Sequence, residues 1–177
     1  MGKTGCGKGT QAHRLAADFG YDLFSTGDRV RALSNEDTSL GRHIRDIHMS
    51  GWVPEWLASY LFAKAILEED IDHGLVFESV ARKPEEAKKL HEMHHMLNRS
   101  YVVLHLDAAD EVVIDRMRKR QRDASDSEEN IKKRLQAFYD ETVRSLEFFR
   151  EQGKVVDIDA TRSPDEVYQE VLKAIAK

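Results

Sequence analysis

A glycine-rich segment, Gly2–Thr10 (GKTGCGKGT), opens the chain and leads directly into a helical pattern. A glycine, four further residues and the pair Gly7-Lys8 give the spacing of a phosphate-binding loop, with the hydroxyl residue one position late, at Thr10. Glycines let backbone N–H groups turn inward around phosphate oxygens, and the following helix adds its positive N-terminal end. We therefore expect Lys8 to reach the β- and γ-phosphates of a nucleotide and Thr10 to lie near a magnesium ion. A glycine-rich loop without a ligand is the alternative, which the helix directly after the loop disfavours.

Short apolar runs alternate with helical patterns along the rest of the chain. Short, continuously apolar runs are typical of strands buried on both faces of a parallel sheet. Strands that alternate with helices predict an α/β fold with a doubly wound parallel sheet. The expected strands are Tyr21–Ser25, Leu75–Phe77, Tyr101–Leu104 and Lys154–Ile158. The expected helices are Lys8–Asp18, Thr26–Ser34, Ser39–Ser50, Pro54–Asp70, Pro84–Asn98, Asp110–Arg120, a long helix over Ile131–Phe149, and Ser163–Ala176.

The first strand of this sheet is expected to be truncated. A phosphate-binding loop connects a central strand to a helix, yet only Met1 precedes Gly2. We therefore expect Leu75–Phe77 and Tyr101–Leu104 to flank a gap with two unpaired apolar edges. For the natural protein, the expectation is about five to eight further apolar residues upstream, the length of a short strand.

Length and composition exclude several other classes of protein. The 177 residues suit a single domain, taken as 1–177, with a sizeable core. One cysteine, Cys6, excludes an intramolecular disulfide or a multi-cysteine zinc site and favours a reducing, cytoplasmic location. The net charge of −5 argues against nucleic-acid binding, and no apolar run approaches the ~18–20 residues that cross a bilayer. We expect a cytoplasmic monomer with no nucleic-acid or membrane partner.

With Gln11 added, the loop reads GKGTQ, and the chain resembles the adenylate kinase family of nucleoside monophosphate kinases. The resemblance covers nearly the whole chain, in the family's order and spacing. Its segments are Gly7–Gln11 (GKGTQ), Ser25–Asp28 (STGD) followed by Arg31, Gly51–Pro54 (GWVP), Gly74–Arg82 (GLVFESVAR), Asp115–Arg120 (DRMRKR), Lys132–Leu135 (KKRL) and Asp159–Arg162 (DATR).

The resemblance implies a P-loop NTPase-type fold with two insertions, at 26–54 for the acceptor nucleotide and at 121–130 as a short lid. It implies transfer of the γ-phosphoryl group of MgATP to AMP, giving two ADP. Donor ATP would contact Gly5, Cys6, Gly7, Lys8, Gly9, Thr10, Arg116, Arg120 and Arg162. Acceptor AMP would contact Thr26, Arg31, Val53, Ser79, Arg82, Glu86, Arg122 and Arg134. Residues that act on the transferred group would be Lys8, Arg82, Arg116, Arg120 and Arg134, with Mg²⁺ held mostly through water near Thr10 and Glu78.

Departures from the family pattern leave alternatives open. Ser79–Ala81 differ from the family sequence, which keeps open a nucleotide-binding protein without turnover, and a P-loop kinase for a small acceptor such as a sugar acid is another alternative. Glu86 stands where the family has a glutamine that reads adenine, and an ionised carboxylate only accepts hydrogen bonds, so GMP is an alternative acceptor.

The basic run Arg116–Arg122 would, alone, suit a solvated helix face. His91–His95 (HEMHH) has zinc-protease spacing, which exposed helices rich in histidine and glutamate produce by chance.

Overall fold

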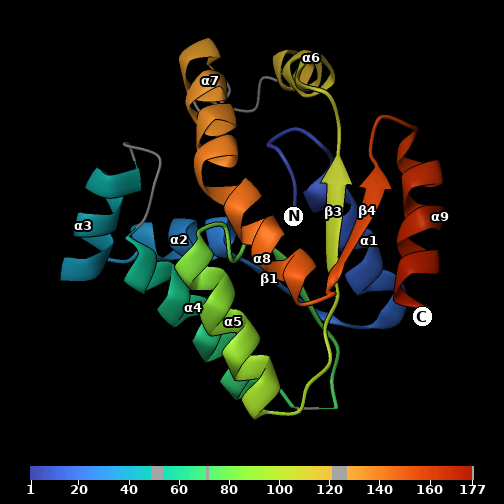
Figure 1. Ribbon diagram of the computed structural model, residues 1–177. Helices are drawn as coiled ribbons and strands as arrows, with labels where there is room; N and C mark the ends of the chain where they lie inside the picture. Colours follow the sequence, from blue (N-terminus) through green and yellow to red (C-terminus); the bar gives the residue numbers. More distant parts are fainter. Residues whose placement is uncertain (49–53, 71, 121–126, 177) are drawn as a thin grey trace.

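A computed structural model describes residues 1–48, 54–70, 72–120 and 127–176, in which helices alternate with four short strands (Figure 1). The boundaries agree with the expected ones to within about three residues, apart from the helix over 131–149. In chain order the elements are α1 (Lys8–Phe19), β1 (Asp22–Ser25), α2 (Thr26–Ser34), α3 (Ser39–His48), α4 (Glu55–Glu68), β2 (Leu75–Glu78), α5 (Pro84–Met96), β3 (Val103–Asp107), α6 (Asp110–Arg120), α7 (Glu128–Ala137), a π-helix (Phe138–Thr142), α8 (Val143–Glu151), β4 (Val155–Asp159) and α9 (Pro164–Ile175).

The strands form two separate parallel pairs. β1 pairs with β2, with Phe24 opposite Phe77, and β3 pairs with β4, with Leu106 opposite Ile158. β3 begins at Val103, so the expected strand Tyr101–Leu104 is placed two residues too early. The β3–β4 ladder starts where Val103 meets Val155, and the Tyr101 ring packs instead against Phe149 at the edge of α8. Parallel pairing throughout agrees with the predicted α/β class.

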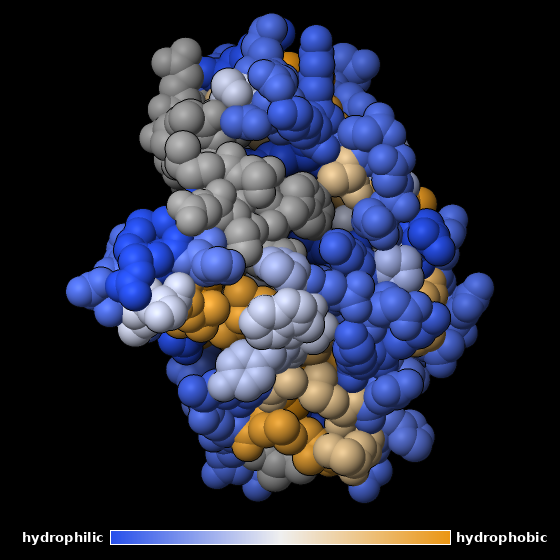
Figure 2. All heavy atoms as spheres, turned by 90° about the vertical axis from the view of Figure 1, so that its left-hand side faces the viewer, coloured by the Kyte–Doolittle hydropathy of each residue, from blue (hydrophilic) through white to orange (hydrophobic). Residues whose placement is uncertain are grey.

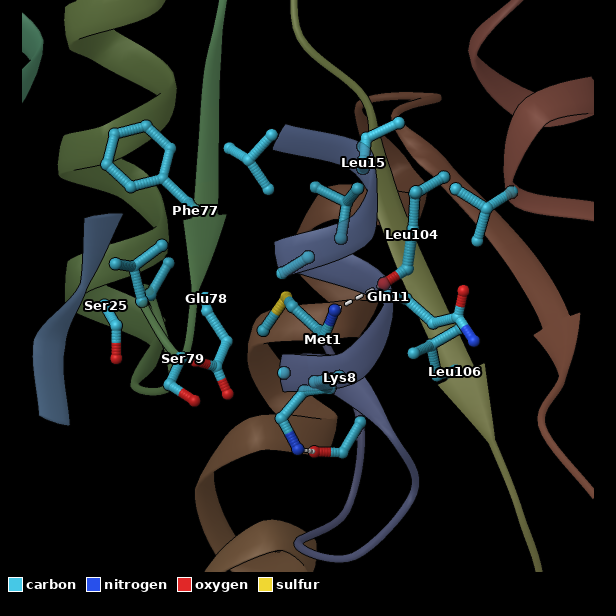
Figure 3. A pocket seen from close by; sticks show the side chains of 18 of the residues that line it. Met1, Lys8, Gln11, Leu15, Ser25, Phe77, Glu78, Ser79, Leu104 and Leu106 are labelled. Atoms are coloured by element: carbon cyan, nitrogen blue, oxygen red, sulfur yellow. Dashed lines mark hydrogen bonds between the residues drawn. The ribbon is translucent and has the colours of Figure 1, made fainter. Parts of the chain in front are cut away.

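The predicted gap lies between β2 and β3 (Figure 3). Met1 lies on the open edge of β3, where its amino group donates to the Leu104 carbonyl and its own carbonyl accepts from Leu106 N–H at 2.9 Å. This is the bonding pattern of a parallel ladder. Val76 of β2 and Leu104 of β3 both line the space between the pairs. The two apolar edges expected from the sequence are therefore present, and the upstream strand stays a prediction.

The described residues form three hydrophobic clusters, and the two larger ones pack against the strands. One joins β3 and β4 to α1, α6 and α9, and it includes the fully buried Val113 and Met117 of α6. The other joins β1 and β2 to α4, α5 and α8, and it includes Phe62 of α4 and Phe149 of α8, each 1% exposed. The second cluster also includes Val103 of β3 and, at its edge, Val155 of β4, so it reaches both strand pairs. Helices thus cover the strands, as a buried parallel sheet requires.

Local sequence signals explain several helix ends. Gly20 takes the left-handed conformation (φ 66°) after α1, and its N–H bonds the Ala16 carbonyl, as expected for a glycine that ends a helix. Ser163 caps α9, because its hydroxyl accepts from the Glu166 N–H at 3.4 Å. The helix expected over 131–149 is instead interrupted by the π-helix Phe138–Thr142. Its extra residue per turn changes the side-chain directions that the helical spacing predicted.

An apolar stripe follows the exposed face of α4. Trp56, Tyr60 and Leu67 are 63%, 57% and 59% exposed, and their spacing places them along one side of the helix. The face of the molecule that carries α3 and α4 is otherwise largely hydrophilic (Figure 2). Among the described residues, no helix combines the length and the apolar character needed to span a membrane.

Two buried histidines are expected to make stability depend on pH. His94 is 5% exposed, with Nδ1 2.9 Å from the Leu90 carbonyl oxygen, and His105 is 8% exposed, with Nδ1 2.6 Å from Asp157 Oδ1. Burial lowers the pKa of both imidazoles below that of an unfolded histidine, and in His105 it outweighs the nearby carboxylate. The unfolded chain therefore binds more protons near pH 6.

The contribution of these two histidines to the free energy of unfolding should accordingly be complete above about pH 6.5, and the free energy of unfolding should fall as the pH drops below that value. Urea unfolding between pH 5 and 8 measures this slope. His105→Gln should flatten it, and the exposed His95→Gln should leave it unchanged. A wild-type stability that is constant over this range would contradict the expectation.

Candidate active site

The phosphate-binding loop closes around its own lysine. Gly5 and Gly7 have φ of 83° and 100°, a region that side chains disfavour, and α1 starts directly after them at Lys8. The Lys8 ammonium donates to the carbonyl oxygens of Gly2 at 2.9 Å and Lys3 at 2.7 Å (Figure 3). Burial lowers the pKa of Lys8. The loop therefore keeps its cation at the start of α1, next to the helix end that favours anions.

The carboxyl end of β2 faces this loop. A Cβ at Gly9 would lie 3.3 Å from Glu78 Oε1, so the carboxylate packs directly against the first turn of α1 (Figure 3). Thr10, in the same turn, is exposed and lines the same cavity. A carboxylate, a hydroxyl and phosphate oxygens are hard ligands of the kind Mg²⁺ prefers, together with water. Glu78 and Thr10 thus offer donors that fit the expected ion.

Ser79 and Arg82 continue from β2 toward the cavity. Ser79 has a positive φ of 64°, which turns the chain away from the strand. Burial, and then the positive charge of Arg134 on α7, lower the pKa of Arg82. Arg82 and Arg134 both line the cavity, where a bound anion would offset their positive charges.

The segment after β1 forms another wall. Ser25 caps α2 by accepting from the Asp28 N–H at 3.3 Å. The Thr26 hydroxyl is buried and has no hydrogen-bond partner among the described residues, and a buried hydroxyl without a partner is costly. Arg31, one turn further along α2, pairs with Asp28. Thr26 and Arg31 thus present an unsatisfied hydroxyl and an exposed cation to the same space.

Arginines from α6 and the β4–α9 loop form the opposite wall. The Arg116 guanidinium donates to the Ala160 carbonyl at 2.8 Å and to the Thr161 carbonyl at 3.3 Å. Arg162 donates from Nε to Asp159 Oδ2 at 3.2 Å. The β4–α9 loop, whose Arg162 is expected to contact ATP, is therefore tied to the helix that carries Arg116.

Glu86 has a structural role that the sequence analysis missed. Its Oε2 accepts from the backbone N–H groups of Arg82 at 2.9 Å and Lys83 at 3.4 Å, at the start of α5. The residue is 5% exposed, and burial raises the pKa of its carboxyl group. A glutamate three positions after the N-cap Lys83, with Pro84 between them, is a recognisable capping signal.

One cavity of about 2000 Å³ brings the expected residues together. The cavity also takes in Gln11, which sequence reasoning did not single out. Gln11 is 6% exposed, and its Nε2 donates to the Pro164 carbonyl at 2.9 Å, which joins α1 to α9. The sign in the sequence that Gln11 belongs to the site was its place in the GKGTQ segment. The expected residues that line the cavity are Gly5, Cys6, Gly7, Lys8, Gly9, Thr10, Thr26, Arg31, Glu78, Ser79, Arg82, Glu86, Arg116, Arg134 and Arg162.

Several predicted residues are not placed in this cavity. Val53 and Arg122 lie outside the described residues, and Arg120 ends α6 without a described side chain. His91 Nδ1 lies 2.6 Å from the Tyr101 hydroxyl, and neither His91 nor His95 lines the cavity. Within the described ranges, the group of side chains arranged for a metal ion, Asp22, Glu69 and His73, includes neither histidine.

Comparison with known proteins agrees with this geometry. The family model described as adenylate kinase matches residues 1–154. The adenylate kinase of Mycobacterium tuberculosis (strain ATCC 25618 / H37Rv) is 35% identical over 179 residues, which cover 100% of this chain and 97% of the relative. The adenylate kinase of Leifsonia xyli subsp. xyli is 34% identical, with 100% and 92% covered, and that of Maricaulis maris is 33% identical, with 99% and 96% covered. The chain belongs to the adenylate kinase family.

Proposed function

We propose that this protein transfers the γ-phosphoryl group of MgATP to AMP and forms two ADP. The observation that carries the proposal is that one cavity is lined by the phosphate-binding loop, by α2 with Thr26 and Arg31, and by both Arg82 and Arg134. A site with a nucleotide-phosphate loop and a separate acceptor wall suits transfer between two nucleotides. Membership of the adenylate kinase family supports the same reaction.

The residues of the cavity supply what phosphoryl transfer needs. The transferred group spreads negative charge over its equatorial oxygens, so catalysis is mainly positioning and stabilisation of that charge. Guanidinium groups suit this role because they stay charged and donate two parallel hydrogen bonds to phosphate. We assign Arg31, Arg82 and Arg134 to the acceptor phosphate, and Lys8, Arg116 and Arg120 to the donor phosphates. Mg²⁺, held with water near Thr10 and Glu78, would neutralise charge on the donor phosphates.

We assign two segments of the single domain to binding of the acceptor and to closure over the bound nucleotides. Residues 26–54 would bind the acceptor, with Val53 and Ser79 near its base, and 121–130 would act as a short lid that carries Arg122. Closure over both nucleotides would exclude water and slow hydrolysis relative to transfer. We further propose that the protein acts as a monomer in the cytoplasm, on small nucleotides rather than nucleic acid or membranes. The net charge of −5 and the single cysteine support this.

The test is ADP formation from MgATP with AMP, GMP, CMP or UMP, and from MgATP alone. Two ADP per AMP consumed, with little ADP in the absence of an acceptor, is the expected result. ADP formation at one rate with and without a monophosphate would show hydrolysis instead. Binding of ATP with no ADP formed in any reaction would identify a nucleotide-binding protein without turnover.

Glu86→Gln tests the acceptor base, because Glu86 lines the cavity while it caps α5. Glutamine keeps one carbonyl oxygen for the backbone N–H of Arg82, so the cap should survive and Tm should change little. If the carboxylate only caps the helix, wild type and variant should both prefer AMP, with kcat/KM ratios for AMP over GMP within about threefold of each other. A wild-type preference for GMP that the substitution reverses would replace the acceptor and leave the kinase fold intact.

A further inference from the structure

Lys3 has an unusual environment for a residue of a phosphate-binding loop. It is 8% exposed, and it does not line the cavity that the loop helps to form. Its ammonium lies 2.7 Å from Asp110 Oδ1 and donates to the Ala108 carbonyl at 3.0 Å. A buried lysine is costly unless it is paired and hydrogen-bonded. The side chain therefore fastens the loop to the chain that follows β3.

Two aromatic residues of the π-helix complete this group. The Tyr139 hydroxyl donates to Asp110 Oδ1 at 2.7 Å. The Lys3 ammonium lies 5.3 Å from the centre of the Tyr139 ring and 5.9 Å from that of Phe138, within the range of cation–π attraction. We call Lys3, Asp110, Phe138 and Tyr139 the Lys3 cluster. A π-helix within a longer helix often marks a functional position, and here it brings Tyr139 to Asp110.

The Lys3 cluster joins three elements at the roots of the expected lid. Asp110 is the first residue of α6, and Tyr139 follows the last residue of α7, so the start of α6 and the end of α7 meet at this cluster. The third element is the loop itself. The carbonyl oxygen of Lys3 accepts from the Lys8 ammonium at 2.7 Å and from the Cys6 N–H at 3.3 Å. Lys3, which the cluster anchors, is thus one of the two residues whose carbonyl oxygens bind the Lys8 ammonium.

We propose that Lys3 is a positioning residue: the ion pair between its buried ammonium and the partly exposed carboxylate of Asp110 fixes the first turn of the loop, and thereby Lys8, relative to α6 and α7. The proposal rests on the proposed function where it concerns turnover. Burial opposes the charge on Lys3, but hydrogen bonds with Asp110 and Tyr139 raise its pKa overall, and the bond with Lys3 lowers the pKa of Asp110. Both groups therefore stay charged near neutral pH, and the pair persists through the working range of the enzyme.

Lys3→Met, Asp110→Asn and the double variant test the anchor. Lys119→Met is the matched control, because Lys119 makes an ion pair of the same 2.7 Å length with Asp115 on the same helix, but fully at the surface. Each single variant should lower kcat about tenfold with the KM for AMP within about twofold, and the double variant should fall no further than the worse single variant. The control should keep wild-type kcat.

Hydrogen exchange gives a second readout that does not depend on activity. Amides of residues 2–8 should exchange about tenfold faster in Lys3→Met, while those of α9 stay as in the wild type. Tyr139→Phe, which removes only a hydroxyl, should accelerate the same amides by a smaller factor and serves if Lys3→Met does not fold.

Unchanged exchange in residues 2–8 would overturn the anchor itself. Faster exchange with kcat within twofold of wild type, or losses that multiply in the double variant, would overturn its role in positioning Lys8. If the wild type makes no ADP, the proposed function fails, and the exchange data still decide whether Lys3 holds the loop.

Discussion

Lys8→Ala should lower kcat by about 10²–10³-fold while the protein stays folded. Lys8 is the cation at the start of α1, and its ammonium lies on the two loop carbonyls that precede it. Loss of a fixed positive charge on the transferring phosphate removes several kcal/mol of transition-state stabilisation. The side chain packs on its own loop rather than in a core cluster, so the free energy of unfolding should change little.

Initial rates of ADP formation at saturating MgATP and AMP measure this loss. Lys173→Ala is the control, because Lys173 is an exposed lysine of α9 that pairs only with Glu170 in the described structure. A Lys8→Ala enzyme that keeps more than about a tenth of the wild-type kcat would refute the assignment of the phosphate-binding loop.

Arg82→Ala should lower kcat/KM for AMP by about 10²–10³-fold. Burial, and then the positive charge of Arg134, lower the pKa of Arg82, and a phosphate bound in the cavity that both arginines line would offset these positive charges. An arginine aimed at a transferring phosphoryl group contributes on this scale or more. Arg82→Lys should recover only a small part of the loss, since an ammonium cannot donate the same pair of parallel bonds.

Steady-state rates at varied AMP concentration test this expectation. Arg150→Ala provides the comparison, because Arg150 is exposed on α8, pairs with Asp157 and does not line the cavity. Loss of activity in both variants to a similar extent would point to a general effect of removing arginine. An Arg82→Ala enzyme with kcat/KM within threefold of wild type would place the acceptor phosphate elsewhere.

The alternation of strands and helices could be predicted because it depends on local patterns. Apolar runs, Gly20 and Ser163 each act over a few residues, and the structure places those elements near their expected boundaries. The π-helix could not be predicted, since Phe138 and Tyr139 fit helical spacing equally well. Within it, Tyr139 contacts Lys3 and Asp110, which are distant in the sequence and could not be paired with it from local patterns.

The candidate site followed from the sequence through motifs rather than geometry. Motif order brought Lys8, Thr26 and Arg82 to one cavity. Thr26 and Arg82 follow the carboxyl ends of β1 and β2, and Lys8 begins the helix after the phosphate-binding loop. The cap made by Glu86 was not predicted, because Glu86 was compared only with the glutamine that the family has at this position. The burial of Lys3 was also not predicted, because nothing near Lys3 in the sequence indicates that it pairs with Asp110, more than a hundred residues later.

The bonds that Lys8 makes to Gly2 and Lys3 have a consequence for which anions the loop accepts. Two of the three N–H donors of the ammonium bind these carbonyl oxygens, so a ligand that takes up all three must exchange hydrogen bonds rather than simply gain them. Bonds to charged groups are worth about 1.5–3 kcal/mol each. A small inorganic anion has few oxygens to replace the hydrogen bonds that Lys8 loses, whereas a polyphosphate chain also accepts hydrogen bonds from the backbone N–H groups around it. The resting loop therefore acts as a filter that favours nucleotides over the abundant simple anions of a cell.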